Sequence, residues 1–420
     1  MRRGSNRYDS SVTAPAPAGF RPGPKYVLML GALAALPAIT TDMYLPSLPT
    51  VAADFSSPEA AAQFTISGML IGGAVGQLVI GPLSDRYGRR KPVIFGVLAH
   101  VLVSILCAFA PNIGTLIGLR MLQGFFNAAA SVVAIAVIRD RFVGSDAARL
   151  LSQLMLVIGV APLFAPTIGG AVIKFGDWRW IFGLLALIGL SLVLVVWRFL
   201  PETLPAERRR IAGPRGIAAG YRELLTDGKF MAVAVIPGLG MAVIMSYVVG
   251  STFVFQEEYG LTEQQFALVF AINGIALVGS AQINAALVRR VAPLRLLRAG
   301  LVLQLIFATG LLAVVITGFG GLIAVMVGLW LVLGMQGMIP ANASVLALGN
   351  YGHMAGTAAA LMGAMQAGVA GLVSPLVGFL GSGGVAMVSV MMGAMVLAIL
   401  ILGLATPAYR RGGAWQQHFG

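Results

Sequence analysis

A series of long apolar segments constrains this chain more than any other feature of its sequence. A helix needs about 20 apolar residues to cross a bilayer. Runs of that length begin near positions 26, 60, 92, 113, 150, 178, 229, 264, 296, 322, 355 and 384. Charged residues make up only 10% of the chain and hydrophobic residues 58%, whereas a soluble protein carries roughly 25% charged residues. Lipid must therefore solvate much of the surface, and the pattern predicts twelve transmembrane helices.

The distribution of basic residues predicts the orientation of these helices. If both termini are cytoplasmic, 25 of the 28 Lys and Arg residues fall in cytoplasmic segments. The external loops then hold only Lys174 and Arg179, while Arg120 lies within a helix. Cytoplasmic loops are enriched in Lys and Arg, so we expect an all-α membrane protein with both termini cytoplasmic. A receptor with seven helices places its termini on opposite sides and fits this distribution poorly.

The segments between the apolar runs divide the chain into parts. Residues 1–25 are polar, basic and rich in Pro and Gly, which predicts a disordered cytoplasmic arm. A cleaved signal peptide is the competing interpretation, but the apolar run that follows is longer than a signal peptide needs. Residues 201–228 combine charge with proline and are predicted to be a cytoplasmic linker. The linker separates six-helix bundles at 26–200 and 229–408, and 409–420 form a cytoplasmic tail, which is a known transporter plan.

Other functional classes find little support in the sequence. The net charge of +13 is accounted for by the cytoplasmic loops, so we expect no nucleic-acid partner. Cys107 is the single cysteine, and His100, His353 and His418 lie far apart. These residues form no metal-ligand spacing and no pair of nucleophile and base. We therefore expect neither a metal site nor an enzyme, and the absence of a sizeable soluble domain disfavours a membrane sensor.

The segment 81–91 carries the first motif, G-P-L-S-D-R-Y-G-R-R-K. A basic loop that only sets topology explains its cations, but not the embedded Asp or the two glycines. The segment resembles the signature loop of the major facilitator superfamily, G-x-L-x-D-R-x-G-R-R/K. The resemblance implies a conformational gate in which a charge cluster latches two halves in the outward-facing state. The gate residues are Gly81, Asp85, Arg86, Gly88, Arg89 and Arg90, and Leu83 also matches the motif.

Two ionisable residues fall within predicted spans of the N-terminal half. A cation inside the membrane costs at least about 2.5–3.5 kcal/mol at a helix centre, and Arg120 either snorkels to the outer surface or faces a polar interior. Asp42 is the carboxylate placed within a span, with an interfacial position as the alternative. Desolvation and a nearby cation act in opposite directions on the proton affinity of a carboxyl group. Asp42 is therefore predicted to exchange protons, and the family resemblance adds Arg120 as the second predicted proton-coupling residue.

The surroundings of these two residues sharpen the resemblance. Residues 120–124, R-M-L-Q-G, resemble the second motif of the superfamily, R-x-x-Q-G, whose arginine faces the central cavity and takes part in proton coupling. Residues 42–49, D-M-Y-L-P-S-L-P, resemble the string found in drug:proton antiporters of the bicyclomycin-resistance and chloramphenicol-efflux type. Two bundles that rock around a central cavity are the fold this resemblance implies.

The fifth predicted helix carries a glycine- and proline-rich segment. Prolines bend a helix and glycines permit close packing, so an ordinary kinked packing helix is one interpretation. The segment also resembles the antiporter motif of exporters, G-x-x-x-G-P-x-x-G-G, although Ala161 replaces the glycine before the first proline. This resemblance favours export over uptake. The motif residues are Gly159, Pro162, Pro166, Gly169 and Gly170.

The C-terminal half contains no ionisable residue within its predicted spans, and its polar residues are amides and hydroxyls. It also contains many methionines, which repack around ligands of varied shape. Packing between helices is the competing interpretation for each of these residues. Residues proposed to line a substrate cavity are Tyr44, Gln123, Asn127, Tyr247, Asn273, Gln336 and Gln366.

The sequence therefore predicts a multidrug efflux transporter of the bacterial inner membrane. It is expected to act as a monomer and to export small amphipathic or apolar drugs or toxic metabolites in exchange for protons. The proton gradient supplies the energy, and no cofactor is expected. The alternative is a proton symporter that imports a small metabolite on the same fold. A symporter site needs more groups that replace the lost hydration of a polar substrate, so the apolar, Met-rich composition disfavours it.

Overall fold

The computed structural model describes residues 24–142, 144–209, 214–349, 351, 354–381 and 383–405, and every regular element within these residues is a helix. Among the described residues, twelve helical segments are long and apolar enough to span a bilayer. The predicted twelve-helix membrane architecture is therefore confirmed. The predicted disordered arm, apart from its last two residues, and the predicted tail lie outside the described residues.

The N-terminal half contains six of the spans. Its elements are α1 (Pro24–Asp42) with η1 (Leu45–Ser47) and α2 (Leu48–Asp54), then α3 (Glu59–Tyr87), α4 (Arg90–Ala108), α5 (Ile113–Arg141), α6 (Gly144–Phe175) and α7 (Arg179–Phe199). Local sequence explains where several of them begin and end. The Asn112 side chain caps α5 by accepting a hydrogen bond from Thr115 N at 2.8 Å, as N-cap residues do. Gly88, at φ +88°, ends α3 in a conformation that favours glycine.

The C-terminal half contains the other six spans. Its elements are α9 (Gly228–Phe253) with η3 (Val254–Glu258), α10 (Glu263–Leu287), α11 (Pro293–Thr317), α12 (Gly321–Gln336) with α13 (Ile339–Leu348), α14 (Ala355–Val373) with α15 (Leu376–Phe379), and α16 (Gly384–Ala405). Two spans are interrupted, one before α13 and one before α15. Pro340 lies in the first turn of α13 and Pro375 precedes α15. Proline lacks the N–H that would continue the helix, so these breaks follow from the sequence.

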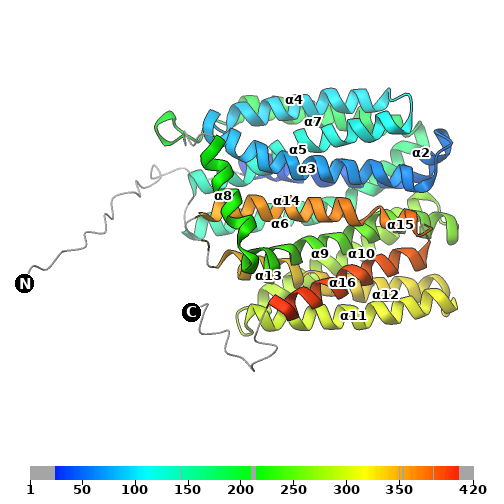
Figure 1. The fold of residues 1–420 in the computed structure, drawn as a ribbon. Coiled ribbons are helices and arrows are strands. Elements are labelled where there is room, and N and C mark those ends of the chain that lie inside the picture. The colour runs from blue at the N-terminus through cyan, green and yellow to red at the C-terminus, as the bar shows by residue number, and fades with distance from the viewer. Residues whose placement is uncertain are drawn as a thin grey trace, which may run out of the picture.

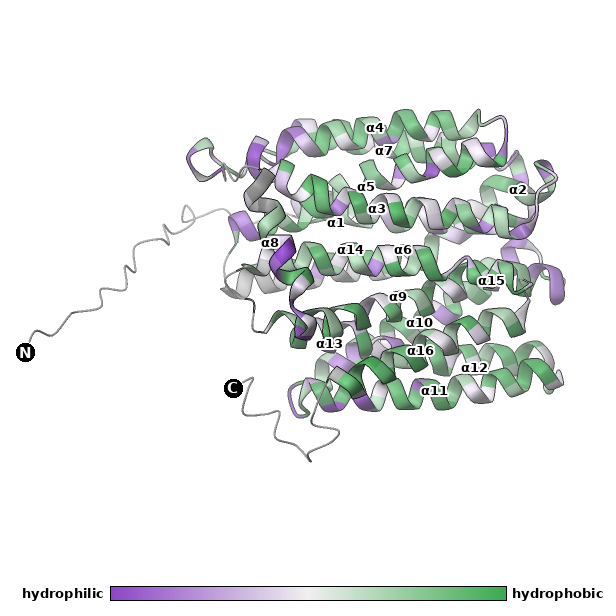
Figure 2. Ribbon diagram, in the orientation of Figure 1, coloured by the Kyte–Doolittle hydropathy of each residue, from purple (hydrophilic) through white to green (hydrophobic). Residues whose placement is uncertain are grey.

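The two halves lie side by side, with their helices roughly parallel. In Figure 1, α3, α4, α5 and α7 form one side of the bundle and α9, α10, α11, α12 and α16 the other, with α14 and α6 between them. Figure 2 shows that the hydrophobic residues run along the length of the helices and that the hydrophilic residues concentrate at their ends. This is the pattern expected where lipid surrounds the middle of each span.

Hydrogen bonds between helices of the two halves lie toward the end of the bundle that the sequence predicts to be external, whereas packing between α3 and α14 continues farther along both helices. Ser67 of α3 and Ser374 have their Oγ atoms 3.3 Å apart. Gln256 donates from Nε2 to Pro46 O at 3.3 Å, and Gln264 donates to Gly170 O at 3.2 Å. The first contact lies beside α14, and the last joins α10 to α6. At this end, polar contacts therefore hold the two halves together.

The predicted linker at 201–228 is more structured than the sequence indicated. It contains a short turn, η2 (Ala206–Arg208), and a helix, α8 (Pro214–Thr226). Leu224 of α8 is fully buried in a cluster with Phe230 and Leu361 of the C-terminal half. The Tyr221 hydroxyl donates to Leu78 O of α3 at 3.4 Å. Helix α8 thus contacts both halves, through the buried Leu224 and the half-buried Tyr221.

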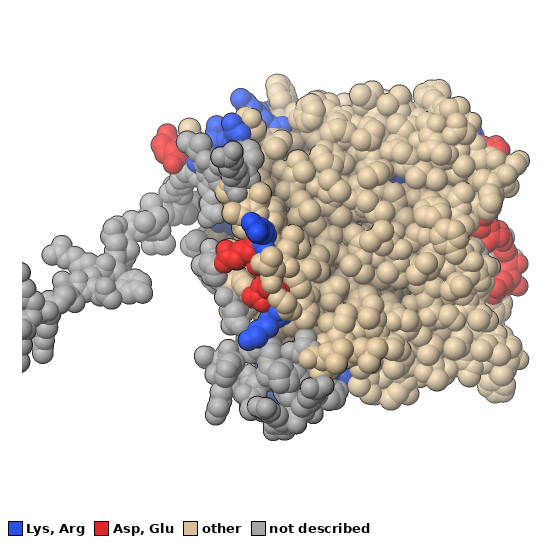
Figure 3. All heavy atoms as spheres, viewed as in Figure 1, with Lys and Arg blue, Asp and Glu red and all other residues tan. Residues whose placement is uncertain are grey.

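Charged side chains avoid the middle of the protein. On the face drawn in Figure 3, Lys and Arg lie mainly at the end that carries α8, acidic residues also lie at the opposite end, and a broad uncharged band separates the two. This distribution agrees with the expected cytoplasmic position of the α8 end. The cytoplasmic location of the two termini stays a prediction.

Candidate functional site

The Arg120 guanidinium is wholly buried within the N-terminal half, at 0% exposure. Its Nη1 donates to Gln123 Oε1 at 2.6 Å, and both Nη atoms approach Thr40 O at 3.4 Å. The group also lies over the rings of Tyr44 and Phe182, at 4.8 and 5.6 Å from their centroids. A hydrogen bond to a charged group is worth about 1.5–3 kcal/mol and a desolvated cation–π contact about 2 kcal/mol. These contacts offset the cost of burial, so Arg120 does not snorkel to the surface.

A chain of side chains continues from Arg120 into α4. Gln123 donates from Nε2 to Ser104 Oγ at 2.7 Å. The Ser104 hydroxyl donates to the carbonyl of His100 at 2.7 Å, and its oxygen lies 3.5 Å from His100 Nε2. Gln123, Ser104 and His100 are each 0% exposed. Four polar residues therefore form one buried chain inside an otherwise apolar bundle.

The position of α5 depends on close packing against α3. A Cβ atom at Gly124 would overlap the carbonyl of Met69, and one at Gly72 would overlap the carbonyl of Met121. Small residues at such crossings let two transmembrane backbones approach closely. The glycine that ends the R-x-x-Q-G motif is thus explained by packing, while Arg120 and Gln123 of the same motif enter the polar chain.

Asp42 is the last residue of α1 and is 5% exposed. Among the described residues it has neither an ion pair nor a hydrogen-bond partner. Arg120 contacts the backbone of Thr40, two residues earlier, rather than the Asp42 carboxylate. The structure therefore brings the two predicted coupling residues to the same end of α1 and leaves both without a countercharge.

The D-M-Y-L-P string redirects the chain directly after Asp42. Helix α1 ends there, and Pro46 lies in the first turn of η1, where a missing N–H costs nothing. This turn places the ring of Tyr44 over Arg120 and 5.4 Å from the ring of Phe182. The Tyr44 hydroxyl accepts a hydrogen bond from Thr65 at 3.3 Å. The predicted cavity residue Tyr44 is thus part of an aromatic cage around the cation.

The signature loop forms a charge cluster around Arg89. The Arg89 guanidinium donates to Asp85 Oδ1 at 2.6 Å and to Asp140 Oδ2 at 2.7 Å, and it also bonds Ser84 at 2.7 Å. Its backbone N–H donates to Glu202 Oε1 at 2.7 Å. These partners come from α3, the end of α5 and the segment after α7. The cluster therefore joins parts of the N-terminal half in this structure, and its predicted role as a latch between halves stays a prediction.

Glu202 closes this cluster from the start of the linker. Partial burial alone raises the pKa of a carboxyl group, but hydrogen bonds from the backbone N–H groups of Arg89, Leu204, Arg90 and Thr203 outweigh it and lower the pKa of Glu202. A Cβ atom at Gly88 would overlap the Glu202 carboxylate. The second glycine of the signature loop is thus required both by its positive φ and by this carboxylate. Gly81 has open space around it, and Arg90 donates from its backbone to Glu202 at 3.2 Å.

The antiporter motif lies along α6, with both of its prolines inside the helix. A Cβ atom at Gly169 would overlap the carbonyl of Met43, so α6 crosses directly over the end of α1. Gly170 faces Glu263 at the start of α10, and a Cβ at Gly159 would lie 3.6 Å from Val278 of the same helix. The motif helix therefore packs against α1 on one side and against the other half on the other.

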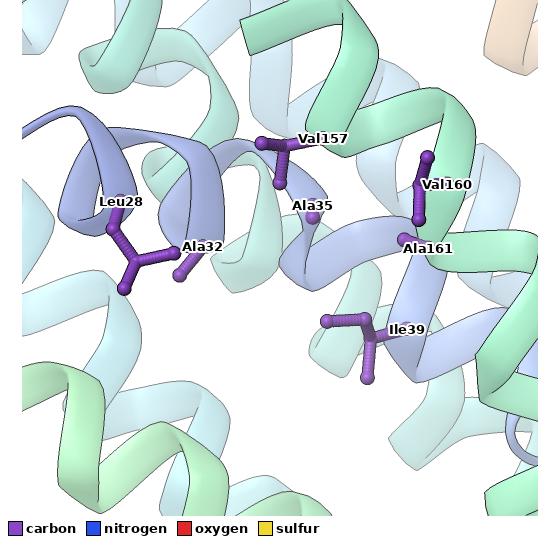
Figure 4. Close-up of a pocket in the computed structure, with 7 residues that line it drawn as sticks. All are labelled: Leu28, Ala32, Ala35, Ile39, Val157, Val160 and Ala161. Atoms are coloured by element: carbon purple, nitrogen blue, oxygen red, sulfur yellow. The ribbon is translucent and has the colours of Figure 1, made fainter. Parts of the chain in front are cut away.

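A cavity of about 450 Å³, which is more open than enclosed, lies between α1 and α6. Figure 4 shows its lining, which consists of apolar side chains from the two helices. The lining residues are Leu28, Ala32, Ala35 and Ile39 of α1 and Val157, Val160 and Ala161 of α6. Pockets of about 300–1,000 Å³ are typical for small ligands. Ala161, the residue that departs from the antiporter motif, lines this cavity.

Three of the four predicted cavity residues of the C-terminal half are hydrogen-bonded to another polar side chain. Asn273 donates to the Tyr247 hydroxyl at 3.2 Å, and Gln304 donates to Gln336 Oε1 at 2.6 Å. Tyr247, Asn273 and Gln336 are buried, whereas Gln366 is half-buried. Asn127 of α5 is 1% exposed, and neither of its amide atoms has a partner among the described residues. Their predicted contact with substrate stays a prediction.

The family model described as Major Facilitator Superfamily matches residues 30–375. The chain belongs to the Major Facilitator Superfamily. It is therefore a multi-pass membrane transporter rather than an enzyme, and the family suggested by its motifs is confirmed.

Two curated relatives of the superfamily and one solved structure are informative. An uncharacterised MFS-type transporter, YdgK, of Bacillus subtilis is 36% identical over 76% of this chain and 80% of its own. A bicyclomycin resistance protein homolog of Haemophilus influenzae is 30% identical over 77% of this chain and 81% of its own. The xylose transporter XylE from E. coli, in a partially occluded inward-open conformation, matches with a TM-score of 0.72 at 15% identity, over 93% of this chain and 98% of its own. The first supports the superfamily, the second supports the expected drug-transporter subfamily, and the third shows the fold.

The sequence did not predict the roles of four residues in this superfamily member's site: Asp140, Glu202, His100 and Ser104. Asp140 and Glu202 complete the charge cluster, but no spacing connected them to the signature loop. His100 and Ser104 are four residues apart on one helix face, which was the available signal for a local pair. Among the described residues, no group of His, Cys, Asp and Glu side chains is arranged to hold a metal ion.

Proposed function

We propose that this chain exports small amphipathic or apolar compounds across a bacterial inner membrane in exchange for protons. One observation carries the proposal: Asp42 and Arg120 are buried at one end of α1 with no countercharge among the described residues, and the same helix lines an apolar cavity. The chain then offers a proton-binding carboxyl group and an apolar site for the ligand. The relative named for bicyclomycin resistance supports a drug as substrate.

Protons and substrate act on the same helix, α1, in this mechanism. Asp42 is its last residue, at the end predicted to be external, and the cavity runs along α1 from Leu28 to Ile39, three residues before Asp42. Protonation of Asp42 removes an uncompensated buried charge, and this favours the conformation in which the group is enclosed. Release of that proton to the cytoplasm accompanies capture of the next substrate. The membrane potential contributes about 2.3 kcal/mol per charge per 100 mV.

Each half contributes one wall to this alternating access. Contacts such as Ser67–Ser374 and Gln256–Pro46 close the predicted external end in this structure. The Arg89 cluster, confined here to the N-terminal half, is then free to engage the other half when the cytoplasmic end closes. We expect the transporter to act as a monomer.

Dye transport in proteoliposomes tests the proposal. With an imposed pH gradient, the purified chain should move ethidium against the direction of proton flow. Asp42→Asn should abolish the gradient-driven component, because the amide cannot exchange a proton. Asp177→Asn, which changes an exposed carboxylate at the predicted external end, is the matched control and should transport normally. Full gradient-driven transport by Asp42→Asn would remove Asp42 from the mechanism.

A proton symporter is the second candidate, favoured by the likeness of the fold to the xylose transporter. The cavity between α1 and α6 is lined by apolar side chains alone, and burying sugar hydroxyls there without partners costs about 1–3 kcal/mol each. The direction of movement decides between the two. Accumulation of radiolabelled xylose together with protons would support the symporter.

A further inference from the structure

The hydrogen bonds of the buried chain have only one consistent direction. The Ser104 hydroxyl has a single proton, which it donates to the carbonyl of His100. Ser104 Oγ must then accept from Gln123, so that the Gln123 amide presents its Nε2 to Ser104 and its Oε1 to Arg120. The imidazole of His100 lies on the remaining side of Ser104 Oγ, at 3.5 Å. The orientation of Gln123 is thus fixed by a serine on a different helix.

Space for this arrangement comes from α7. A Cβ atom at Gly189 would lie 3.2 Å from Cδ2 of His100 and 2.7 Å from Val101 Cγ2. The imidazole therefore occupies room that a larger residue would remove. His100 Nδ1 has no partner among the described residues, so the ring is held by packing and by its contact with Ser104.

The hydrogen-bonded series of Gln123, Ser104 and His100 sets the position of the Arg120 guanidinium. The guanidinium bonds Gln123 at 2.6 Å but only approaches Thr40 O at 3.4 Å, so Gln123 is its shorter contact. Its Nε has no partner among the described residues. The titratable groups that interact with it are Tyr44 beside α1 and Cys107 and His100 of α4. From α7 it meets the ring of Phe182, and Asp42 lies two residues beyond Thr40.

We propose that Ser104 and His100 are positioning residues, which act through Gln123 to hold the Arg120 guanidinium away from the Asp42 carboxyl group. The inference deepens the proposed function, because it assigns the residues that keep the coupling carboxyl free to bind a proton. If the anchor is lost, Arg120 can turn toward Asp42, and an ion pair then favours the deprotonated form of that carboxyl.

Carbodiimide labelling tests this positioning without relying on transport. Dicyclohexylcarbodiimide modifies protonated carboxyl groups in apolar surroundings. Peptide mapping of the purified full chain in detergent gives the fraction labelled at Asp42 as a function of pH. Ser104→Ala should move the midpoint of labelling to lower pH by roughly one unit, as a carboxylate beside a cation does. Gln123→Leu should give the same shift, and His100→Phe a smaller shift in the same direction.

Three controls separate positioning from a loss of structure. Ser104→Thr keeps the hydroxyl and should restore the native midpoint. Ser191→Ala removes a serine that also bonds the carbonyl four residues earlier, Leu187 O at 2.8 Å, but is exposed on α7; its midpoint should not move. Thermal unfolding of each variant verifies that it is folded, because a merely structural role lowers stability without moving the midpoint.

The possible outcomes are distinct. Folded Ser104→Ala and Gln123→Leu proteins with native midpoints overturn the inference. A native protein that labels as expected but transports no compound leaves the inference intact and removes the proposed function. If the native protein transports but the midpoints of the variants do not move, the proposed function stands and the inference about Ser104 and His100 is overturned.

Discussion

The two halves of the molecule bury polar side chains in different ways. The N-terminal half encloses a cation, Arg120, and a carboxyl group, Asp42, and supports the first with a chain of three further side chains. The C-terminal half encloses neutral pairs, such as Gln304 with Gln336 and Asn342 with Asn284 at 2.7 Å. Neutral pairs satisfy each other at fixed geometry, whereas an uncompensated charge favours whichever conformation supplies a proton or a countercharge. Under the proposed function, this difference assigns energy coupling to the N-terminal half and a structural role to the C-terminal half.

The largest expected effect is a loss of transport, and the contrast between the halves fails if changes in both halves produce it. Arg120→Met should reduce gradient-driven ethidium transport by roughly 100-fold or more, because the buried charge and its coupling free energy of several kcal/mol are lost. Gln304→Leu, at the buried pair of the C-terminal half, removes two hydrogen bonds, to Val332 O and Gln336 Oε1, each worth about 1 kcal/mol, and should leave transport within a few-fold of native. Initial rates in proteoliposomes at matched protein content measure both. Equal losses would show that coupling is spread over the two halves.

A smaller effect should be shared by both halves, because it concerns packing. Gly124→Ala places a Cβ against the carbonyl of Met69, and Gly337→Ala places one against Ser280 and Ala281. Overpacking of this kind costs about 1–3 kcal/mol, so both variants should unfold at lower temperature in detergent. Gly118→Ala, on the same helix as Gly124 but with open space around it, is the control and should keep or slightly raise the unfolding temperature. Loss of stability in only one of the two variants would show that close packing, like charge, differs between the halves.

The smallest effect concerns pH and sharpens the comparison at the end predicted to be cytoplasmic. Backbone hydrogen bonds outweigh partial burial and lower the pKa of Glu202, where the linker leaves the N-terminal half. A hydrogen bond from the Tyr351 hydroxyl lowers the pKa of Asp227, where the linker enters the C-terminal half. A lowered folded-state pKa stabilises the protein above the ordinary carboxyl pKa, near 4, and this contribution is lost as pH falls through the folded-state value.

Replacement of either carboxylate should therefore matter at neutral pH and disappear in acid. Glu202→Gln and Asp227→Asn should each lower the unfolding temperature at pH 7, and the difference from native should shrink as the pH falls from 5 to 3. Glu207→Gln, which changes a nearby exposed carboxylate of the linker, is the matched control and should follow the native curve. A difference that grows in acid would contradict the assigned direction.

Much of the fold could be predicted because a lipid environment requires apolar residues along each span, and this requirement is visible in the composition. Runs of apolar residues and the placement of Lys and Arg were sufficient for twelve spans, and the signature loop for the family. Helix α8 was missed because its charged residues dominate the linker, although Leu224 is buried. The breaks before α13 and α15 coincide with Pro340 and Pro375, but proline inside a span also occurs without a break, as at Pro162 of α6.

The site was harder to predict than the fold. Asp42 and Arg120 were identified because charge is rare inside a span, yet the sequence could not show that they lack an ion pair in this conformation. Ser104 and His100 escaped notice because a buried serine or histidine in an apolar helix has no signature of its own. The cavity is lined by Leu, Ala, Ile and Val, and such residues cannot be distinguished by type from those that face lipid.

Under the proposed function, the cavity between α1 and α6 also bears on how the range of exported compounds evolves. Its walls include small apolar side chains such as Ala32, Ala35 and Ala161, and none of them belongs to the hydrogen-bonded series from Arg120 to His100. Single substitutions between alanine, valine and isoleucine change the shape of this space without altering any charge or hydrogen bond. Selection by a new compound would then have a route to a different substrate range that leaves the proposed proton coupling untouched.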